Sequence, residues 1–200
     1  MRFLLRGEGN FGSFNQNHPH GSMKIKQILS QQVDTEDAKT SELFISLSSI
    51  RKQGYLTKTQ LLWILHWKSP RPLRHYQTND PKDVKEITAL AFSMRNELLR
   101  MHLLTALNGV NYPAASAILM FYDRKRYPVL DIRVWQQLYK AGLVHSNPRG
   151  QNFSLQQWLD YLSIIRKLGK QYGLTARQVE KRLFDYDRST RKEKLYSTGR

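Results

Sequence analysis

Asp131 is the residue of this sequence best placed to do chemistry. It follows the run Pro128-Val129-Leu130, which is expected to be extended, and precedes a stretch in which apolar residues recur at helical spacing from Val134 to Tyr139. This pattern predicts that Asp131 lies at the N-terminus of a helix, where the helix dipole and backbone N–H groups keep a carboxylate ionised. Such a carboxylate can stabilise a developing positive charge or activate water. The alternative is an N-cap that contributes about 1 kcal/mol of stability and no chemistry.

A second informative segment is the run Leu107, Asn108, Gly109, Val110 and Asn111. A helix is expected to end near its start, and the next helix to begin at residue 112 or 113, because a proline is tolerated in the first turn of a helix. Gly109 and Asn111 adopt left-handed or open backbone conformations at low cost. A turn of this kind directs backbone N–H groups outward, which suits a phosphate oxygen. The alternative is an ordinary turn between helices that binds nothing.

The turn and Asp131 together resemble the helix-hairpin-helix DNA glycosylase superfamily, which includes endonuclease III, the adenine glycosylase acting opposite oxidised guanine, and the alkyl-purine glycosylases. The family pattern is Leu-Pro-Gly-Val-Gly, an alanine-bearing helix, and then Val-Asp. Here residues 107–111 stand for the hairpin and Leu130-Asp131 for the Val-Asp pair, and Asp131 comes 22 residues after Gly109. The resemblance covers residues 103–142. It implies that Asp131 is the essential carboxylate, acting near C1′ of a flipped nucleotide, and that the hairpin binds the backbone of duplex DNA.

The sequence departs from the family pattern at three positions. Bifunctional members carry a lysine that forms a Schiff base two residues after the second hairpin glycine, and here that position is Pro113. Schiff-base lyase chemistry from this position is therefore not expected. Asn111 replaces the second glycine, which weakens the phosphate seat. Arg133 stands where the family often has histidine, and it is expected either to contact a phosphate or to pair with Asp131.

A glycosylase also needs side chains that enclose the flipped base and fill the gap that the base leaves in the duplex. The richest stretch for this is expected to be an ordered loop after a helix, and it mixes aromatic and cationic residues. Its candidates for the base pocket or the wedge are Trp67, Lys68, Arg71, Arg74, His75 and Tyr76. Trp63, Trp135 and Trp158 lie among apolar residues and are expected in the core.

The charge of the chain favours a polyanionic partner. There are 32 lysines and arginines against 16 aspartates and glutamates, a net charge of +16, with a pI near 10.2. We expect this partner to be duplex DNA. The run Arg124, Lys125 and Arg126 is expected to add phosphate contacts on the side that faces DNA, although a solvated loop explains it almost as well.

The sequence also excludes several kinds of site. With no cysteine there is no disulfide, thiolate metal site or iron–sulfur cluster. The histidines lack metal-ligand spacing, and no Walker or dinucleotide-binding loop is present. We expect no cofactor, and the hairpin is the one place that suits a monovalent cation. No apolar run approaches the roughly 18 residues of a membrane helix, so we expect a soluble, cytoplasmic monomer with no membrane or protein partner.

The elements that must position these residues are helices. Capping patterns begin at Thr57, Ser154 and Thr175, and Asp80 precedes a proline at a helix start. Glycines 54, 142 and 173 fall where helices should stop. We expect an all-α domain of eight or nine short helices over residues 23–187. Residues 1–22 are expected to be a disordered leader, and residues 188–200 a basic, solvated tail.

We therefore expect a monofunctional DNA glycosylase-like enzyme that extrudes a damaged or modified base and cleaves its N-glycosidic bond with Asp131. The first alternative is a non-catalytic helix-hairpin-helix module that binds DNA, with Asp131 as a helix cap. The second is a protein that binds structured RNA. Which base is removed cannot be predicted, because specificity depends on pocket side chains rather than on the scaffold.

Overall fold

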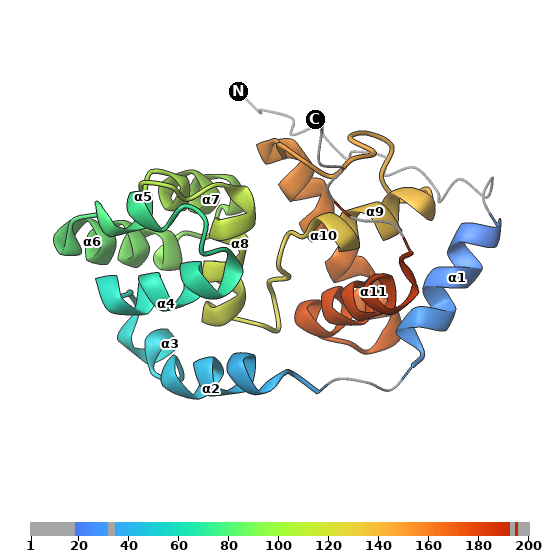
Figure 1. Ribbon diagram of the computed structural model, residues 1–200, viewed down its shortest axis with the longest axis horizontal. Helices are drawn as coiled ribbons and strands as arrows, with labels where there is room; N and C mark the ends of the chain where they lie inside the picture. The colour runs from blue at the N-terminus through green and yellow to red at the C-terminus, as the bar shows by residue number, and fades with distance from the viewer. Residues whose placement is uncertain (1–18, 32–34, 193–194, 196–200) are drawn as a thin grey trace, which may run out of the picture.

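The structure is a computed structural model that describes residues 19–31, 35–192 and 195. Within these ranges the chain forms eleven helices and no strand, which confirms the all-α prediction (Figure 1). The helices are α1 (Pro19–Leu29), α2 (Ala38–Ser46), α3 (Ile50–Gln53), α4 (Lys58–Lys68), α5 (Leu73–Gln77), α6 (Pro81–Ser93), α7 (Glu97–Thr105), α8 (Tyr112–Tyr122), α9 (Ile132–Lys140), α10 (Leu155–Tyr172) and α11 (Ala176–Thr190). The sequence predicted only eight or nine helices, because α3 and α5 are too short to show a helical period.

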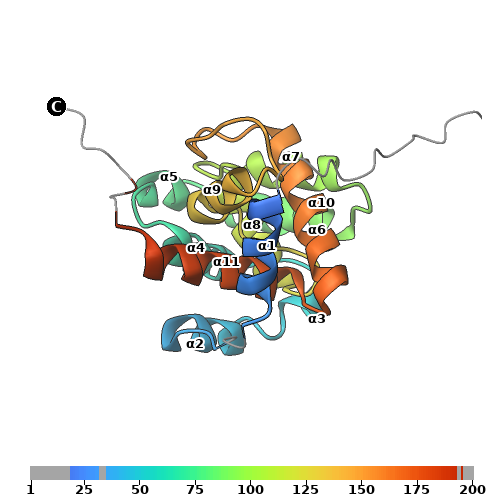
Figure 2. The same ribbon diagram turned by 90° about the vertical axis from the view of Figure 1, so that its right-hand side faces the viewer.

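The helices form two groups. Helices α2 to α8 make one group, and α1, α9, α10 and α11 make the other (Figure 1). Within the second group α1 packs against α11, which also contacts α9 and α10 (Figure 2). The chain passes from the first group to the second through residues 123–131, so the segment that ends at Asp131 lies between them.

The local signals for helix ends are confirmed. Thr57, Ser154 and Thr175 each form a complete capping box with the glutamine three residues later. Asp80 accepts a hydrogen bond from the N–H of residue 82 at the start of α6. The expected stop glycines at 54, 142 and 173 all have positive φ, between 67° and 78°. These signals involve neighbouring residues only, which is why the sequence predicts them well.

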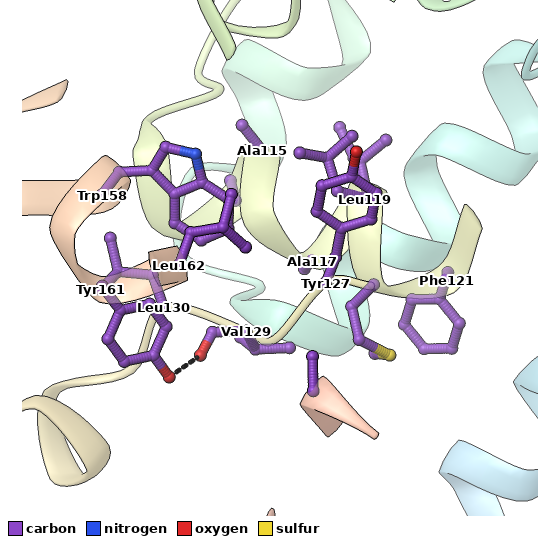
Figure 3. Packing of buried hydrophobic residues seen from close by; sticks show 14 of the residues in the cluster. Ala115, Ala117, Leu119, Phe121, Tyr127, Val129, Leu130, Trp158, Tyr161 and Leu162 are labelled. Carbon is purple, nitrogen blue, oxygen red and sulfur yellow. Dashed lines mark hydrogen bonds between the residues drawn. The ribbon is translucent and has the colours of Figure 1, made fainter. Parts of the chain in front are cut away.

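Helix α8 runs through the middle of the core. All of its residues from Ala114 to Phe121 are buried, and α4 and α7 pack against it. Near its start the side chain of Ala115 is small, and Trp158 and Leu162 of α10 lie beside it (Figure 3). Trp135 and Trp158 are buried, as expected.

Trp63 is not in the core: it is 46% exposed, so this expectation was wrong. Helix α4 is apolar over five consecutive residues, and apolar content alone does not tell which side faces inward. The buried side is set by Leu61, Ile64 and Leu65, whose spacing of three and four residues leaves Trp63 outside it.

The first and last helices extend beyond the expected domain boundaries. Helix α1 begins at Pro19, inside the range expected to be a leader, and residues 1–18 of that range lie outside the described residues. Helix α11 continues to Thr190, so Arg188 belongs to a helix and not to a tail. Arg191 is bound to Asp187 at 2.7 Å, whereas residues 193–194 and 196–200 again lie outside the described residues. None of the described helices is both long and apolar enough to span a membrane.

Candidate active-site cavity

The segment that leads into Asp131 is fixed by two buried hydrogen bonds. The N–H of Leu130 donates to Ser116 Oγ on α8 at 2.8 Å. On the other side, Tyr161 OH on α10 donates to the carbonyl of Val129 at 2.7 Å (Figure 3). Ser116 and Tyr161 are both fully buried. The extended backbone before Asp131 is therefore attached to both groups of helices, which holds the aspartate in place.

Asp131 caps α9, as expected, and its second oxygen binds a lysine. Oδ1 accepts a hydrogen bond from the N–H of Arg133 at 2.9 Å, and Oδ2 accepts one from Lys68 Nζ at 2.9 Å. Burial opposes ionisation of this carboxyl, but the charge and hydrogen bond of Lys68 and the N–H of Arg133 outweigh it. The pKa of Asp131 therefore lies below its ordinary value. The carboxylate is ionised at neutral pH.

Asp131 and Lys68 line a cavity of about 460 Å³. The walls come from four segments: residues 35–37, the end of α4, the extended segment before α9, and one side of α11. Besides Asp131 and Lys68, the lining residues are Thr35, Glu36, Asp37, Trp67, Val129, Arg177, Glu180, Lys181, Phe184, Asp185 and Arg188. This volume lies within the range of about 300–1,000 Å³ that is typical of small-molecule sites. A single nucleobase is smaller than such a site.

A buried ion-pair network forms part of the wall. Arg177 binds Glu36 with two hydrogen bonds of 2.8 Å each, and its remaining Nη1 donates to Glu180. Burial disfavours the charge of Arg177, but the two carboxylates outweigh this and raise its pKa. For Glu180 burial is the larger effect, so its pKa is raised although Arg177 attracts the charged form. The network joins residues 36 and 177, which are far apart in the chain.

Helix α11 is also attached to the loop before Asp131 through the backbone. The N–H of Ala176 donates to the carbonyl of Lys125, and the N–H of Arg177 donates to the carbonyl of Arg124, both at 3.1 Å. These are first-turn N–H groups, which have no partner inside their own helix. The start of α11 is therefore fixed to the segment that connects α8 to Asp131.

Of the two roles considered for Arg133, pairing of its side chain with Asp131 is not found, and contact with a phosphate stays a prediction. Arg133 Nη1 donates to Asp187 Oδ2 on α11 at 3.0 Å, and its guanidinium lies 5.8 Å from the ring of Phe184. The reason is helical geometry: the side chain of Arg133 leaves α9 toward α11, while its backbone N–H faces the capping carboxylate. Lys68, from a helix far away in sequence, takes the position that was considered for Arg133.

Two of the six pocket or wedge candidates, Trp67 and Lys68, line the cavity. Trp67 is held by a hydrogen bond from its Nε1 to Thr40 Oγ1 at 2.9 Å and by edge-on contact with Phe121. Arg71, Arg74 and His75 are exposed and lie outside the cavity wall, and a wedge role for them stays a prediction.

Tyr76 is only 1% exposed, so it is a core residue and not available to stack on a base. The sequence suggested a loop here, because aromatic and cationic residues are mixed with Pro70 and Pro72 in this stretch. The chain instead forms the short helix α5, which directs Tyr76 inward. Its ring packs on Gly109, where an added Cβ would lie 2.9 Å from Tyr76 Cδ1 and from His75 Cβ.

The turn at residues 107–111 lies where it was expected, but the N–H groups of Asn108 and Val110 are not free for a phosphate, because they donate to Asn79 Oδ1 and to the carbonyl of Leu107. Helix α7 ends at Thr105, α8 begins at Tyr112, and Gly109 has a φ of +79°. Asn111 caps α8 by accepting a hydrogen bond from the N–H of Ala114 at 3.1 Å. Asn79 holds the turn from outside, because it accepts from the N–H of Asn108 and donates to its carbonyl. The contact of Gly109 with α5 gives this glycine a packing role that is independent of any ligand.

The basic run 124–126 is not next to this turn. It follows the C-terminal end of α8, whereas the turn precedes the N-terminal end, and a helix of 11 residues is about 16 Å long. Arg124 lies over the ring of Phe44 at 4.9 Å, and Arg126 pairs with Glu97 at 3.4 Å. If both regions contact DNA, they do so at separate places, and the phosphate role of Arg124, Lys125 and Arg126 stays a prediction.

The sequence did not identify Glu36, Arg177 or Glu180 as site residues. The α11 residues of the cavity wall do follow a helical spacing, at positions 177, 180, 181, 184, 185 and 188. Five of these six are charged, and a charged helix side normally faces solvent. Glu36 lies 141 residues from Arg177, and nothing local in the sequence indicates that they meet.

Comparisons with protein-family models, curated proteins and solved structures gave no match to this chain. The described residues contain no group of three histidine, aspartate or glutamate side chains arranged to hold a metal ion. The function must therefore be argued from the cavity itself.

Proposed function

We propose that this protein is a monofunctional DNA glycosylase-like enzyme that hydrolyses the N-glycosidic bond of a base extruded from duplex DNA. The observation that carries the proposal is the position of Asp131, an ionised carboxylate at a helix N-terminus on the wall of a cavity large enough for a nucleobase. The resemblance of residues 103–142 to helix-hairpin-helix glycosylases and the net charge of +16 support it.

In the proposed reaction the bond between C1′ and the base nitrogen breaks, and the bonding electron pair leaves with the base. The sugar becomes positively charged at C1′, and the Asp131 carboxylate stabilises this charge. Water then adds to C1′, and Asp131 accepts the proton that this water releases. The same proton then passes from Asp131 through solvent to the departed base, so Asp131 is ionised again and the base carries one proton more than it had when bonded. Asp131 suits both roles because its pKa is low enough to keep it ionised beforehand.

Lys68 has a positioning role in this proposal. It donates one hydrogen bond to Asp131, and an ammonium has two further donors, which suit a phosphate oxygen beside the extruded nucleotide. An ammonium has no lone pair for attack on C1′. Together with Pro113 at the hairpin position, this favours hydrolysis over formation of a Schiff base.

The test is an abasic-site assay on duplexes that carry deaminated, oxidised or alkylated bases, with alkali used to cleave the product. We expect Asp131→Asn to lower base release at least 100-fold, in line with the effect of removing one electrostatic group from an active site. Asparagine is as good an N-cap as aspartate, so the helix is retained.

Asp37→Asn is the matched control, because Asp37 also caps a helix, has a lowered pKa and lines the same cavity. We expect it to keep activity close to that of the wild type. If no duplex yields abasic sites above the level of the Asp131→Asn protein, the glycosylase proposal is wrong.

One observation favours a second candidate, a DNA-binding module without catalysis. Both oxygens of Asp131 already accept a hydrogen bond within the protein, so the carboxylate is also explained as a structural cap. In that case Asp131→Asn leaves duplex affinity unchanged while no protein releases a base. For either candidate, affinity should fall steeply with salt concentration, because the lysines and arginines displace counterions from the phosphates.

A further inference from the structure

Glu180 is a second carboxylate in the cavity, and one of its oxygens has no partner. The residue is 2% exposed, and its Oε2 accepts a hydrogen bond from Arg177. Oε1 accepts none from the described residues. Among the described residues, Trp158 Nε1 is the only side-chain polar atom that has neither a hydrogen-bond partner nor contact with solvent. Oε1 of Glu180 has no partner either, so it must have some contact with solvent. Oε1 is therefore reached from the cavity that Glu180 lines.

The ion-pair network holds one carboxylate more than its single guanidinium neutralises. Glu36 binds Arg177 through two hydrogen bonds of 2.8 Å, and Glu180 also stabilises its charge. Adding Glu180 leaves two carboxylates on one guanidinium. Burial of a surplus charge lowers stability unless another group compensates it. A buried carboxylate in excess of the cationic group that it binds is typical of a ligand site.

Two aromatic rings line the same cavity. Trp67 is fixed by its bond to Thr40 and its contact with Phe121, and Phe184 lies one helical turn beyond Glu180 on the same side of α11. Trp67 also lies under the guanidinium of Arg177, 5.8 Å from its ring. Rings of this kind suit a flat aromatic ligand, as in enzymes that hold an extruded base by stacking.

The charge of the cavity differs from that of the whole protein. Its wall has five carboxylates and four cationic side chains, whereas the chain carries a net charge of +16. The wall as a whole therefore offers no surplus of positive charge, and the phosphate contact proposed for Lys68 concerns the nucleotide backbone and not the base. A ligand that presents N–H donors is favoured, because Glu180 Oε1 can accept a hydrogen bond and receives none from the described residues.

We propose that Glu180 recognises the extruded base, by accepting at Oε1 a hydrogen bond from an exocyclic amino group. The substrate base then belongs to the amino-bearing class of adenine, guanine and cytosine derivatives. Uracil and thymine derivatives are disfavoured, because carbonyl oxygens flank their only ring N–H at that edge and repel the carboxylate. This inference rests on the proposed function, since it assigns the substrate class of the same cavity.

The experiment measures binding of free adenine, cytosine, uracil and thymine to the full chain by calorimetry. We expect adenine or cytosine to bind the wild type at least tenfold more tightly than uracil and thymine. Glu180→Gln should weaken that binding at least tenfold, because a hydrogen bond to a charged group is lost. The control is Asp160→Asn, which removes one negative charge from an exposed position on α10 outside the cavity and should change affinity less than twofold.

Folding of the variant is checked by its thermal midpoint, and glutamine retains an acceptor for Arg177. A second variant, Phe184→Leu, should weaken binding of every base without changing the preference for amino-bearing ones. The proposal is overturned if no free base binds the wild type, if uracil binds as tightly as adenine and cytosine, or if Glu180→Gln binds like the wild type.

The two proposals can fail separately. Free-base binding that depends on Glu180, together with no base release from any duplex, would refute the glycosylase and leave recognition by Glu180 standing. Base release that requires Asp131 but is the same for Glu180→Gln and the wild type would refute only the role of Glu180.

Discussion

Replacing Ser116 by alanine tests how Asp131 is held in place. In the wild type the buried N–H of Leu130 donates to Ser116 Oγ at 2.8 Å, and Ser116 in turn donates to the carbonyl of Pro113 at 2.7 Å. Alanine is common in this helix and fits the space, so the main change is a buried N–H without an acceptor. Such a group costs about 1–3 kcal/mol. For a chain of this size, about 2 kcal/mol corresponds to roughly 4–8 °C in the unfolding midpoint.

The assay is urea unfolding at pH 7, followed by the midpoint of thermal unfolding. Ser46→Ala is the matched control, because Ser46 is exposed and only donates to a carbonyl of its own helix. Its free energy of unfolding should change by less than about 0.5 kcal/mol. Tyr161→Phe, which removes the donor to the carbonyl of Val129, should cost less than Ser116→Ala, since a carbonyl without a partner is tolerated better than an N–H.

A Ser116→Ala protein as stable as the Ser46→Ala protein would refute this reasoning. It would mean that the extended segment moves to find another acceptor, and that the position of Asp131 is not fixed by α8. The rate of base release by the Ser116→Ala protein is a second measurement of how Asp131 is held. If Asp131 acts on C1′, a displacement of its backbone should lower the rate even at temperatures where the variant remains folded.

Two further predictions concern Asp131 and Lys68, and a third concerns the turn at Gly109. The pKa of Asp131 is lower in the folded protein than its unfolded value of about 3.9. Its contribution to stability is therefore present above about pH 4 and is lost as pH falls through the folded pKa. The difference in unfolding free energy between wild type and Asp131→Asn should be constant from pH 5 to 7 and shrink below pH 4. Gly109→Ala should destabilise the protein more than Gly54→Ala, measured by urea unfolding, because both glycines have φ near +78° but only at Gly109 would the new Cβ meet side chains, at 2.9 Å. Borohydride added during base release should trap no covalent complex with DNA, and a trapped complex that disappears in Lys68→Gln would show that Lys68 acts as a nucleophile after all.

The sequence predicted the parts of the fold that depend on neighbouring residues. Capping residues, stop glycines and the turn at residues 107–111 involve contacts over a few positions, and the structure has them where they were expected. The N-cap position of Asp131 belongs to the same category. Which side of a helix faces the core depends on distant partners, and here the predictions for Trp63 and Tyr76 were wrong.

The candidate site was only partly predictable for the same reason. Lys68 was singled out for its charge, but its partner Asp131 lies 63 residues away and could not be assigned. Glu180 and Arg177 belong to a charged side of α11 that looks like a solvent-facing one. It becomes a cavity wall only because residues 35–37 and the end of α4 pack opposite it.

The two backbone hydrogen bonds between the start of α11 and the loop after α8 restrict the movement of α11 relative to that loop. They tie the helix that bears Glu180 to the stretch of chain that ends at Asp131, so the two acids move as one piece. Entry of a large ligand into the cavity then requires only that a side-chain ion pair separates, either Lys68–Asp131 or Glu36–Arg177. The amides of Ala176 and Arg177 should accordingly exchange with deuterium slowly, whether the cavity is open or shut.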